Sequence, residues 1–305
     1  MKTPTLSPIL ISLCFAAISC RTTAPANDTS RPADAVESSD AATSDEGDEE
    51  EEGVQRNIGR FVRYELHTSD VQGAARFYSD LFGWSIEAAE DDGEGVFQIR
   101  RQGRLIGRLR AYDASRKIPE GWMSWVSVND VDDMMRDVEA NGGKILRHPW
   151  TVREERRALL VGPTGGTFGI VRADNGDGPD EDPAEGGWYW SQLWTTDFET
   201  SVNFYGVIGT YVTTVYPYQK LTYVVFENDG RRRAVVVRGP KGQPSRWLPV
   251  VRVRNVEKMV NEAQALKARV LVAPREIAGL GSIAVLQSPV GGIFGVISPT
   301  EDVSG

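Results

Sequence analysis

Residues Tyr64–Trp84, YELHTSDVQGAARFYSDLFGW, recur in altered form as Ser191–Tyr211, SQLWTTDFETSVNFYGVIGTY. Both stretches carry a Thr and an Asp in front of an amphipathic segment, and both place a Phe-Tyr pair inside that segment. The matching positions keep a constant spacing. They are Leu66 with Leu193, Thr68 with Thr195, Asp70 with Asp197, Phe77 with Phe204 and Tyr78 with Tyr205.

Two further blocks repeat in the same order. The stretch from Trp122 to Pro149 matches that from Trp247 to Pro274, and Gly162–Val171 (GPTGGTFGIV) matches Ser288–Ile297 (SPVGGIFGVI). Three matched blocks in one order indicate a duplicated domain. The predicted division is a signal peptide at 1–19, an acidic tether at 20–56, a first module at 57–172, an acidic linker at 173–186, a second module at 187–298 and a tail at 299–305.

Each copy has an internal repeat of its own. Asp70 and Asp130 each stand where an N-cap is expected, and Gly83 and Gly143 follow where the helices end. Short β-rich runs surround both helices. We therefore predict an α+β fold in which each module is a pair of βαβββ units forming a cupped mixed sheet. The predicted helices are Val71–Phe82, Asp130–Ala140, Phe198–Tyr205 and Val256–Leu266.

The N-terminus is typical of an exported protein. The apolar run from Leu6 to Ile18 is too short to span a bilayer. It ends in Ala17-Ile18-Ser19-Cys20, which resembles a bacterial lipoprotein signal with Cys20 as the lipidated residue. This resemblance implies an outer-membrane lipoprotein of the cell envelope, facing the periplasm or the surface, that touches the membrane only through its lipid. The alternative is an ordinary cleaved signal with an incidental cysteine.

Cysteine content and charge exclude several kinds of site. Cys14 and Cys20 are the only cysteines, so the mature modules have no thiol for disulfides, zinc ligation or nucleophilic catalysis. The net charge of −9 comes largely from the tether and the linker, both poor in large apolar residues and expected to be disordered. Their acidity indicates solubility and says nothing about substrate. We expect no nucleic-acid partner.

The paired βαβββ pattern, with the strings FYSDLFGW and GPTGGTFGIV, resembles the vicinal-oxygen-chelate superfamily of glyoxalase I, bleomycin-resistance proteins and extradiol dioxygenases. The resemblance covers about 58–172 and 187–298. It implies a ligand site on the concave face of each sheet, and in metal-using members His or Glu ligands on the strands that line this face. The motifs are specific for the fold and not for an activity.

The family's ligand positions carry over to residues that do not bind divalent cations. The first-strand, second-half and last-strand positions fall on Arg63, Met123 and Gly169 in copy one and on Trp190, Leu248 and Gly295 in copy two. A usual metal site needs several converging His or carboxylate ligands, and the whole chain has only His67 and His148. We therefore expect no metal and no other cofactor.

Alternation along the strands predicts what lines the cups, because residues two apart share a face of a sheet. Copy two would form an aromatic slot, and in copy one Glu65 and His67 are candidates for proton transfer. The predicted ligand-binding residues are Arg63, Glu65, His67 and Trp125 in copy one and Trp190, Gln192, Trp194 and Arg252 in copy two.

Structural interpretations remain open beside these. Glu65 is matched by Gln192, so the position could hydrogen-bond backbone at the seam of the module, and His67 could lie half-exposed at a strand end. The glycine-rich turns lack the Lys-Ser/Thr of a phosphate loop, Trp84 is expected in the core and His148 in a surface turn. The arginines Arg153, Arg156, Arg157 and Arg231–Arg233 are expected to be solvated loop and strand-edge charges.

The sequence therefore favours an envelope-anchored, metal-independent protein that binds a small, partly apolar or aromatic ligand. Bleomycin-resistance proteins are the precedent that the resemblance offers, and the two modules are expected to pair within one chain. One alternative is a glyoxalase-like lyase or dioxygenase that uses Glu65 and His67. The other is a structural or protein-interaction role at the cell surface, with the cups filled by Trp125, Trp190 and Trp194.

Overall fold

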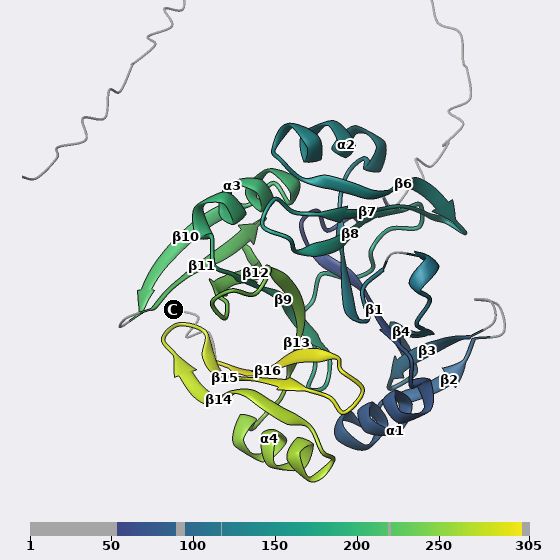
Figure 1. Ribbon diagram of the computed structural model, residues 1–305, viewed down its shortest axis with the longest axis vertical. Coiled ribbons are helices and arrows are strands. Elements are labelled where there is room, and N and C mark those ends of the chain that lie inside the picture. Colours follow the sequence, from purple (N-terminus) through teal and green to yellow (C-terminus); the bar gives the residue numbers. More distant parts are fainter. Residues whose placement is uncertain (1–53, 90–94, 117, 219–220, 301–305) are drawn as a thin grey trace, which may run out of the picture. The chain divides into compact units, whose positions relative to one another are not determined.

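The computed structural model describes residues 54–89, 95–116, 118–218 and 221–300. The predicted signal peptide, Cys20 and nearly all of the predicted tether lie outside these residues. The described residues form one compact unit that contains two eight-stranded sheets, which we call module 1 and module 2 (Figure 1). Within the described ranges, no helix has both the length and the apolar character needed to cross a bilayer.

Module 1 is a single sheet with the strand order β2-β3-β4-β1-β5-β8-β7-β6. The short helix η2 (Ala114–Arg116) joins its two halves. The other elements are β1 (Phe61–Thr68), α1 (Val71–Phe82), β2 (Ser85–Ala88), β3 (Val96–Arg101), β4 (Arg104–Ala111), β5 (Gly121–Ser127), α2 (Val131–Ala140), β6 (Lys144–Val152), β7 (Glu155–Val161) and β8 (Thr167–Ala173).

Module 2 repeats this topology with the order β10-β11-β12-β9-β13-β16-β15-β14. Its elements are β9 (Trp188–Thr195), α3 (Phe198–Ile208), β10 (Val212–Tyr218), β11 (Leu221–Asn228), β12 (Arg231–Arg238), β13 (Arg246–Arg252), α4 (Val256–Ala265), β14 (Arg269–Ile277), β15 (Gly281–Gln287) and β16 (Ile293–Pro299).

The strand pairing confirms the predicted α+β fold of paired βαβββ units. Strand β1 runs parallel to β4 and β5 runs parallel to β8, so the first and last strands of each unit are neighbours. The two units of a module meet where β1 pairs antiparallel with β5, and β9 with β13 in module 2. Each sheet is therefore continuous across a central seam.

Local sequence signals account for the first helix of each module. The carboxylate of Asp70 accepts a hydrogen bond from the backbone N–H of Gly73, and that of Asp197 accepts one from Thr200. These bonds satisfy amide groups that have no partner inside the helix. Gly83 ends helix α1 with φ of 67°, a left-handed conformation that costs glycine little.

The hairpin of β6 and β7 is longer than the sequence indicates. We predict strands over 144–147 and 158–161, whereas the paired region extends to Val152 and back from Glu155. Charged residues interrupt the apolar pattern here, and ion pairs on the sheet neutralise several of these charges. His148 is exposed as expected, but it lies within β6 and not in a turn.

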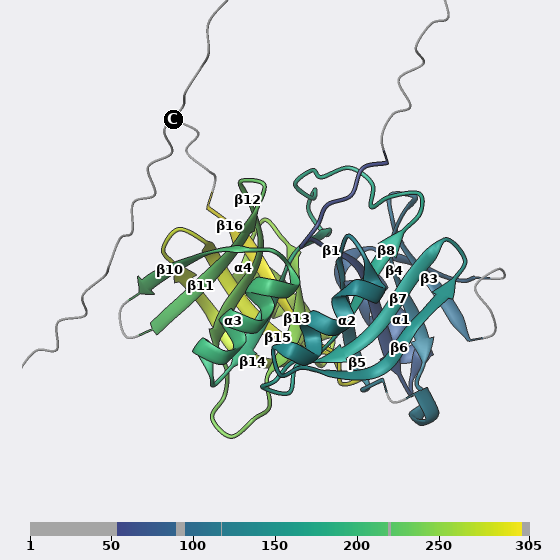
Figure 2. The ribbon, with the colours of Figure 1, turned by 90° about the horizontal axis from the view of Figure 1, so that it is seen from above.

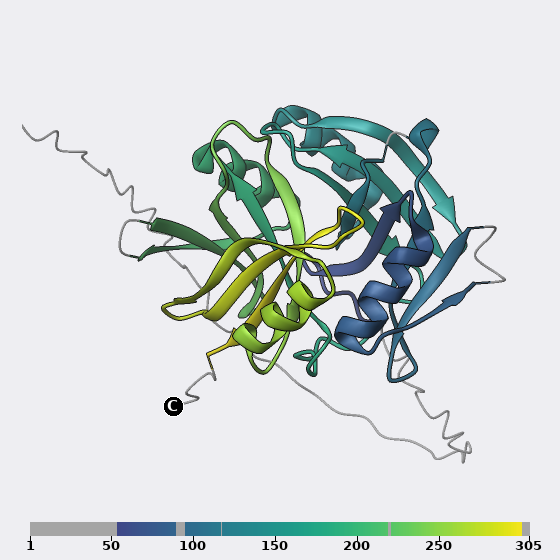
Figure 3. The same ribbon diagram turned by 60° about the horizontal axis from the view of Figure 1, so that its bottom comes forward.

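The two modules share one hydrophobic core through a reciprocal contact, in which a tyrosine of each module reaches the glycine-rich turn of the other. A methyl group on Gly292 of module 2 would lie 2.7 Å from Oη of Tyr78 in α1. A methyl group on Gly166 of module 1 would lie 2.9 Å from Oη of Tyr205 in α3. Helix α1 lies beside α4, and α2 beside α3 (Figures 1 and 3).

Hydrogen bonds fix both tyrosines at this interface. Oη of Tyr78 accepts from Nε1 of Trp122 at 2.8 Å, and Oη of Tyr205 donates to the carbonyl of Gly166 at 3.3 Å. Burial raises the pKa of both phenols above the ordinary value, so both stay neutral at physiological pH. The repeated Phe-Tyr and Gly-Gly motifs thus join the two modules to each other.

We predict that Gly292→Ala lowers the free energy of unfolding by about 1–3 kcal/mol, because the new methyl group overpacks against the buried ring of Tyr78. Gly206→Ala is the matched control. Gly206 lies inside α3 with nothing within 4 Å of an added Cβ, so alanine there should stabilise by about 0.5–1 kcal/mol. Urea denaturation measures both changes, and equal effects would contradict the proposed packing.

Candidate functional site

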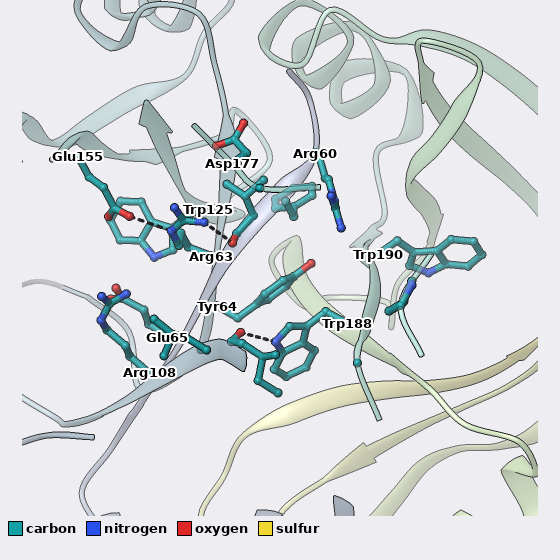
Figure 4. Close-up of a pocket in the computed structure, with 18 of the residues that line it drawn as sticks. Arg60, Arg63, Tyr64, Glu65, Arg108, Trp125, Glu155, Asp177, Trp188 and Trp190 are labelled. Carbon is teal, nitrogen blue, oxygen red and sulfur yellow. Dashed lines mark hydrogen bonds and ion pairs between the residues drawn. The ribbon is translucent and has the colours of Figure 1, made fainter. Parts of the chain in front are cut away.

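A cleft of about 1940 Å³ opens over module 1. Its lining comes from β1, β4, β5, β6 and β7, from the linker around Asn175–Ala184, and from the edge of module 2 at Trp188–Trp190 and Arg231–Arg233 (Figure 4). Ligand pockets commonly measure about 300–1,000 Å³, so this cleft has room for a small molecule and ordered water. Its floor is the cup of module 1, the sheet face that carries Arg63, Glu65 and His67.

A buried carboxylate, Glu65, lies at the centre of this cup. Arg157 donates through Nη1 to Oε1 of Glu65 at 2.9 Å. Oε2 of Glu65 has Nε of Arg110 at 3.3 Å and Nε2 of His67 at 3.6 Å. Glu65 and His67 are each only 3% exposed. Alternation along β1 therefore places both residues on the face that the sequence predicts, and both are more deeply buried than a strand-end position would suggest.

A second carboxylate, Glu155, extends the network along β7. It accepts from Nε of Arg63 at 2.8 Å and from Nε of Arg157 at 2.7 Å, with a further short contact from Nη2 of Arg157. Figure 4 shows Arg63 and Glu155 facing each other beside Trp125. Arg157 thus bridges both carboxylates, and three guanidinium groups surround two acids.

The charges in the cup keep both acids ionised. Burial by itself would raise the pKa of Glu65, but the contact with His67 and the charges of Arg157 and Arg110 outweigh it and hold the pKa far below the ordinary value. Burial would also raise the pKa of Glu155. The positive charges of Arg157 and Arg63 outweigh this effect, so the pKa of Glu155 is lowered. A carboxylate with so low a pKa is a weak base, so Glu65 is poorly suited to remove a proton from a substrate at neutral pH.

Trp125 covers the part of the cup where the last-strand family ligand would stand. Trp125 pairs with Gly169 across the sheet, and a Cβ at position 169 would overlap the indole ring. The guanidinium of Arg157 lies 4.9 Å from the centre of the same ring. The indole N–H groups of Trp125 and Trp190 are buried and have no hydrogen-bond partner among the described residues. Both tryptophans line the cleft.

The corresponding face of module 2 is filled by its own side chains. Trp190, Trp194, Leu248 and Val250 belong to one buried hydrophobic cluster with residues of β11, β12, β15 and β16. Of the predicted residues of copy two, Trp190 lines the cleft, whereas Gln192, Trp194 and Arg252 do not. Figure 4 shows Trp190 apart from the Arg63–Glu155 pair. A ligand-binding role for Gln192, Trp194 and Arg252 stays a prediction; Trp194 packs in the cluster, and Arg252 donates to the carbonyl of Pro183 in the linker.

The linker, predicted to be disordered, makes specific contacts with both modules. The carboxylate of Asp180 lies 2.7 Å from Arg233 and 3.6 Å from Arg231 of β12, and 3.3 Å from Arg60 beside β1. Asp177 accepts from the backbone N–H of Asn57 and from Oγ of Ser127. Its acidic residues therefore neutralise arginines at the rim of the cleft, and the expectation of disorder was wrong for this segment.

Two arginines expected in solvent are buried. Arg157 is 5% exposed and Arg233 is 4% exposed, because each extends over a sheet face toward carboxylates that neutralise it. Arg157 lies two residues before Leu159 on β7, so the two side chains share a face of the sheet. This alternation could have predicted from the sequence that Arg157 faces inward. No pattern in the sequence pairs Asp180 with Arg233, because these residues meet only in the folded chain.

Part of the chain resembles a known superfamily in sequence. Residues 60–170 match the model of the Glyoxalase/Bleomycin resistance protein/Dioxygenase superfamily. Module 1 is therefore similar in sequence to members of this superfamily. Module 2 repeats the same strand order. A protein of Mycobacterium tuberculosis (strain CDC 1551 / Oshkosh) named "Putative glyoxylase CFP32" is 25% identical over 242 residues, which cover 77% of this chain and 93% of that protein.

A second relative and two solved structures extend the comparison. The anthracycline biosynthesis protein DauV of Streptomyces sp. (strain C5) is 27% identical over 157 residues, covering 47% of this chain and 57% of DauV. The Mn(II)-bound glyoxalase from Novosphingobium aromaticivorans superposes with a TM-score of 0.58 at 17% identity, covering 80% and 83% of the two chains. The 2,3-dioxygenase LapB from Pseudomonas sp. KL28 gives 0.54 at 14% identity, covering 82% and 96%. These two structures establish likeness of fold.

The residues at the family's metal-binding positions do not fit a divalent cation. The predicted positions Arg63 and Gly169 both pair with Trp125 of β5, and the third predicted position, Met123, lies two residues before Trp125 on the same strand. A guanidinium repels a cation, an indole N–H only donates, and glycine has no side chain. Among the described residues, no three His, Cys, Asp or Glu side chains come together as ligands would. We therefore derive no metal-dependent step for this site.

The two lowered carboxyl pKa values predict loss of stability in acid. In an unfolded chain the two carboxyl groups have pKa values near 4, so as the pH falls they bind protons before the same groups do in the folded protein. The contribution of Glu65 and Glu155 to the free energy of unfolding is therefore complete above about pH 5 and is lost as the pH falls further. Denaturant titrations between pH 7 and pH 3 measure this loss. The variant Glu65→Gln should be less stable than the parent protein at pH 7, and its free energy of unfolding should fall less between pH 7 and pH 3. If the variant and the parent lose the same free energy over this range, Glu65 is not one of the groups responsible.

Proposed function

We propose that this protein binds a small, partly apolar or aromatic molecule in the cleft over module 1, without metal-dependent catalysis. The observation that supports this most directly is the difference between the two sheets. The cup of module 2 is packed with its own apolar side chains, whereas that of module 1 combines a smaller apolar cluster around Trp125 with charged groups and an open cleft.

An aromatic or otherwise flat ligand suits the apolar part of this cleft. Trp125 and Trp150 meet edge to face with their ring centroids 5.9 Å apart, and Arg147 lies 3.8 Å above the ring of Trp150. Trp150 is half-buried and lines the cleft. One relative is named for anthracycline biosynthesis, so flat polycyclic compounds are suitable first probes. Stacking on such rings contributes about 0.5–1.5 kcal/mol for each aromatic pair beyond burial.

A lyase or dioxygenase is the competing proposal, supported by the relatives named as glyoxylases. Its acid–base pair would be Glu65 and His67. The lowered pKa of Glu65 and the arginines that occupy its oxygens weigh against proton abstraction by this carboxylate. We therefore favour binding over catalysis, and metal analysis separates the two proposals.

Anchoring in the cell envelope is the second part of the proposal. It rests on the sequence around Cys20, which lies outside the described residues. Lipidation at that position would hold the two modules at a membrane surface through the acidic tether. Stable anchoring needs more than one acyl chain, which a triacylated or diacylated cysteine would provide. We propose the outer membrane of a bacterial envelope as its location.

We predict that the purified protein contains no stoichiometric metal and that Trp150→Ala weakens binding of anthraquinone-2-carboxamide by about tenfold, equivalent to about 1.4 kcal/mol. Inductively coupled plasma mass spectrometry and quenching of tryptophan fluorescence measure the two quantities. Tyr112→Ala is the control, since Tyr112 is exposed and outside the cleft lining. One tightly held Mn(II), Fe(II), Ni(II) or Zn(II) per chain, with turnover of a thiohemiacetal or catechol, would support the enzyme instead.

For the anchor, we predict that Cys20→Ser abolishes incorporation of labelled palmitate and moves the protein from the membrane fraction to the soluble fraction of a bacterial expression host. The reason is that only a cysteine thiol accepts the diacylglycerol at this position. Cys14→Ser is the matched control and should change neither result, because Cys14 lies within the predicted signal peptide. Equal fractionation of both variants would contradict lipid anchoring.

A further inference from the structure

The geometry points to an organic anion, such as an aromatic or aliphatic carboxylate, as the ligand of the cleft over module 1. This inference rests on the proposed binding function and specifies the class of ligand. The two cups of the chain carry different residues at equivalent strand positions, and the cup of module 1 has donors that a ligand can reach.

Strand register identifies which residues of the two modules are equivalent. Glu65 pairs with Met123 and Arg108, as Gln192 pairs with Leu248 and Val235. Arg110 pairs with His67 as Val237 pairs with Trp194, so Arg110 and Val237 are equivalent. In the same way Arg157, which pairs with Val171, is equivalent to Ile283, which pairs with Ile297. The equivalent pairs are therefore Arg63/Trp190, Glu65/Gln192, His67/Trp194, Arg108/Val235, Arg110/Val237, Trp125/Val250 and Arg157/Ile283.

Module 2 serves as an internal control for the fold. Its neutral side chains at these positions are buried in a packed cluster, so the curled sheet forms without ions there. Replacing buried ion pairs by well-packed apolar residues is often neutral or stabilising in proteins, because desolvation offsets the attraction between the charges. The charged groups of module 1 are thus not required by the fold, and a ligand is the simplest reason for their presence.

The charged groups of the cup do not balance within the network described above. Arg63, Arg110 and Arg157 bring three positive charges, while Glu65 and Glu155 bring two negative charges. The network therefore has one positive charge in excess, before any charge on His67 is counted. Because water and counterions screen poorly in a largely buried cup, this excess favours an anion over a neutral molecule.

Some donors of the network remain accessible to a ligand. Nε, Nη1 and Nη2 of Arg157 all bind the two carboxylates, and this residue holds the acids in place. Arg110 contacts Glu65 through Nε, and its side chain is 17% exposed. The side chain of Arg63 is 23% exposed. Trp125 lines the same cleft, but this residue is 1% exposed and its indole N–H is buried, so the accessible donors are those of Arg110 and Arg63.

Carboxylates are well matched to these donors. A planar carboxylate takes two parallel hydrogen bonds from a guanidinium, and its charge strengthens both of them. An aromatic framework attached to it would extend over Trp125 toward Trp150. The inferred ligand is therefore a carboxylate, with its acid group near Arg110 or Arg63 and its apolar part against the two indole rings.

The first experiment compares three matched probe pairs on the purified protein by isothermal titration calorimetry. They are benzoate with benzamide, 2-naphthoate with 2-naphthamide, and anthraquinone-2-carboxylate with its carboxamide. We expect at least one acid to bind at least tenfold more tightly than its amide, with a preference that shrinks in high salt. Equal binding of acids and amides overturns the anion inference and leaves the proposed function standing. If no probe binds at millimolar concentration, both proposals fail.

The second experiment converts the cup of module 1 into that of module 2. The variant Glu65→Gln/Arg110→Val/Arg157→Ile removes the network around Glu65 and leaves the Arg63–Glu155 pair intact. We expect its melting temperature to equal or exceed that of the parent protein, its acid probe to bind at least tenfold more weakly, and its amide probe to bind as before. The control Asp133→Asn/Arg136→Gln/Arg254→Gln removes the same charges at exposed sites and should leave both affinities unchanged.

Loss of folding in this triple variant would show that the charges hold the module together, and would overturn the inference that they serve a ligand. Arg110→Gln provides an independent readout, since this side chain lies at the accessible edge of the network. It should leave the fold intact and reduce the preference for acid over amide. An unchanged preference in Arg110→Gln and in Arg63→Gln would also contradict the inference.

Discussion

The packing of each module's tyrosine against the glycine-rich turn of the other module determines how the rest of this protein is arranged. Tyr78 reaches the turn at Gly292, and Tyr205 reaches the turn at Gly166, with no room for a Cβ at either glycine. The contact is reciprocal, so one duplicated pair of motifs makes both halves of the interface. It merges the helix-covered faces of two sheets into a single core and leaves the opposite faces available for other uses (Figure 2).

The two cups differ in composition although the modules share one fold. Because the shared core lies on the helical side, the residues of the cups contribute less to holding the modules together, and the same strand positions hold arginine and glutamate in one module and valine, isoleucine and tryptophan in the other. Module 2 gains stability from an apolar cluster. Module 1 carries a network whose charges must be desolvated, which is the arrangement expected where a site is kept for binding.

The same network occupies the cup where proteins similar to this chain would hold a metal. At the predicted metal-binding positions the cup has Arg63, Met123 and the bare backbone of Gly169, and the ring of Trp125 lies between Arg63 and Gly169. Arg157 then bridges Glu65 and Glu155, so both carboxylates of the network are held by guanidinium groups. The linker completes the site from outside, since Asp180 neutralises arginines of both modules at the rim of the cleft.

The sequence by itself determined the duplication, the βαβββ units, the caps at Asp70 and Asp197 and the face on which Arg63, Glu65 and His67 lie, because these depend on local periodicity and on repeats along the chain. It did not reveal that Arg157 and Arg233 are buried or that the acidic linker is ordered, because charges are normally solvated and their burial depends on partners distant in sequence. It also left open which cup is filled. Only the tertiary structure decided that, since long-range packing determines whether a strand's inward side chains meet one another or face an open cleft.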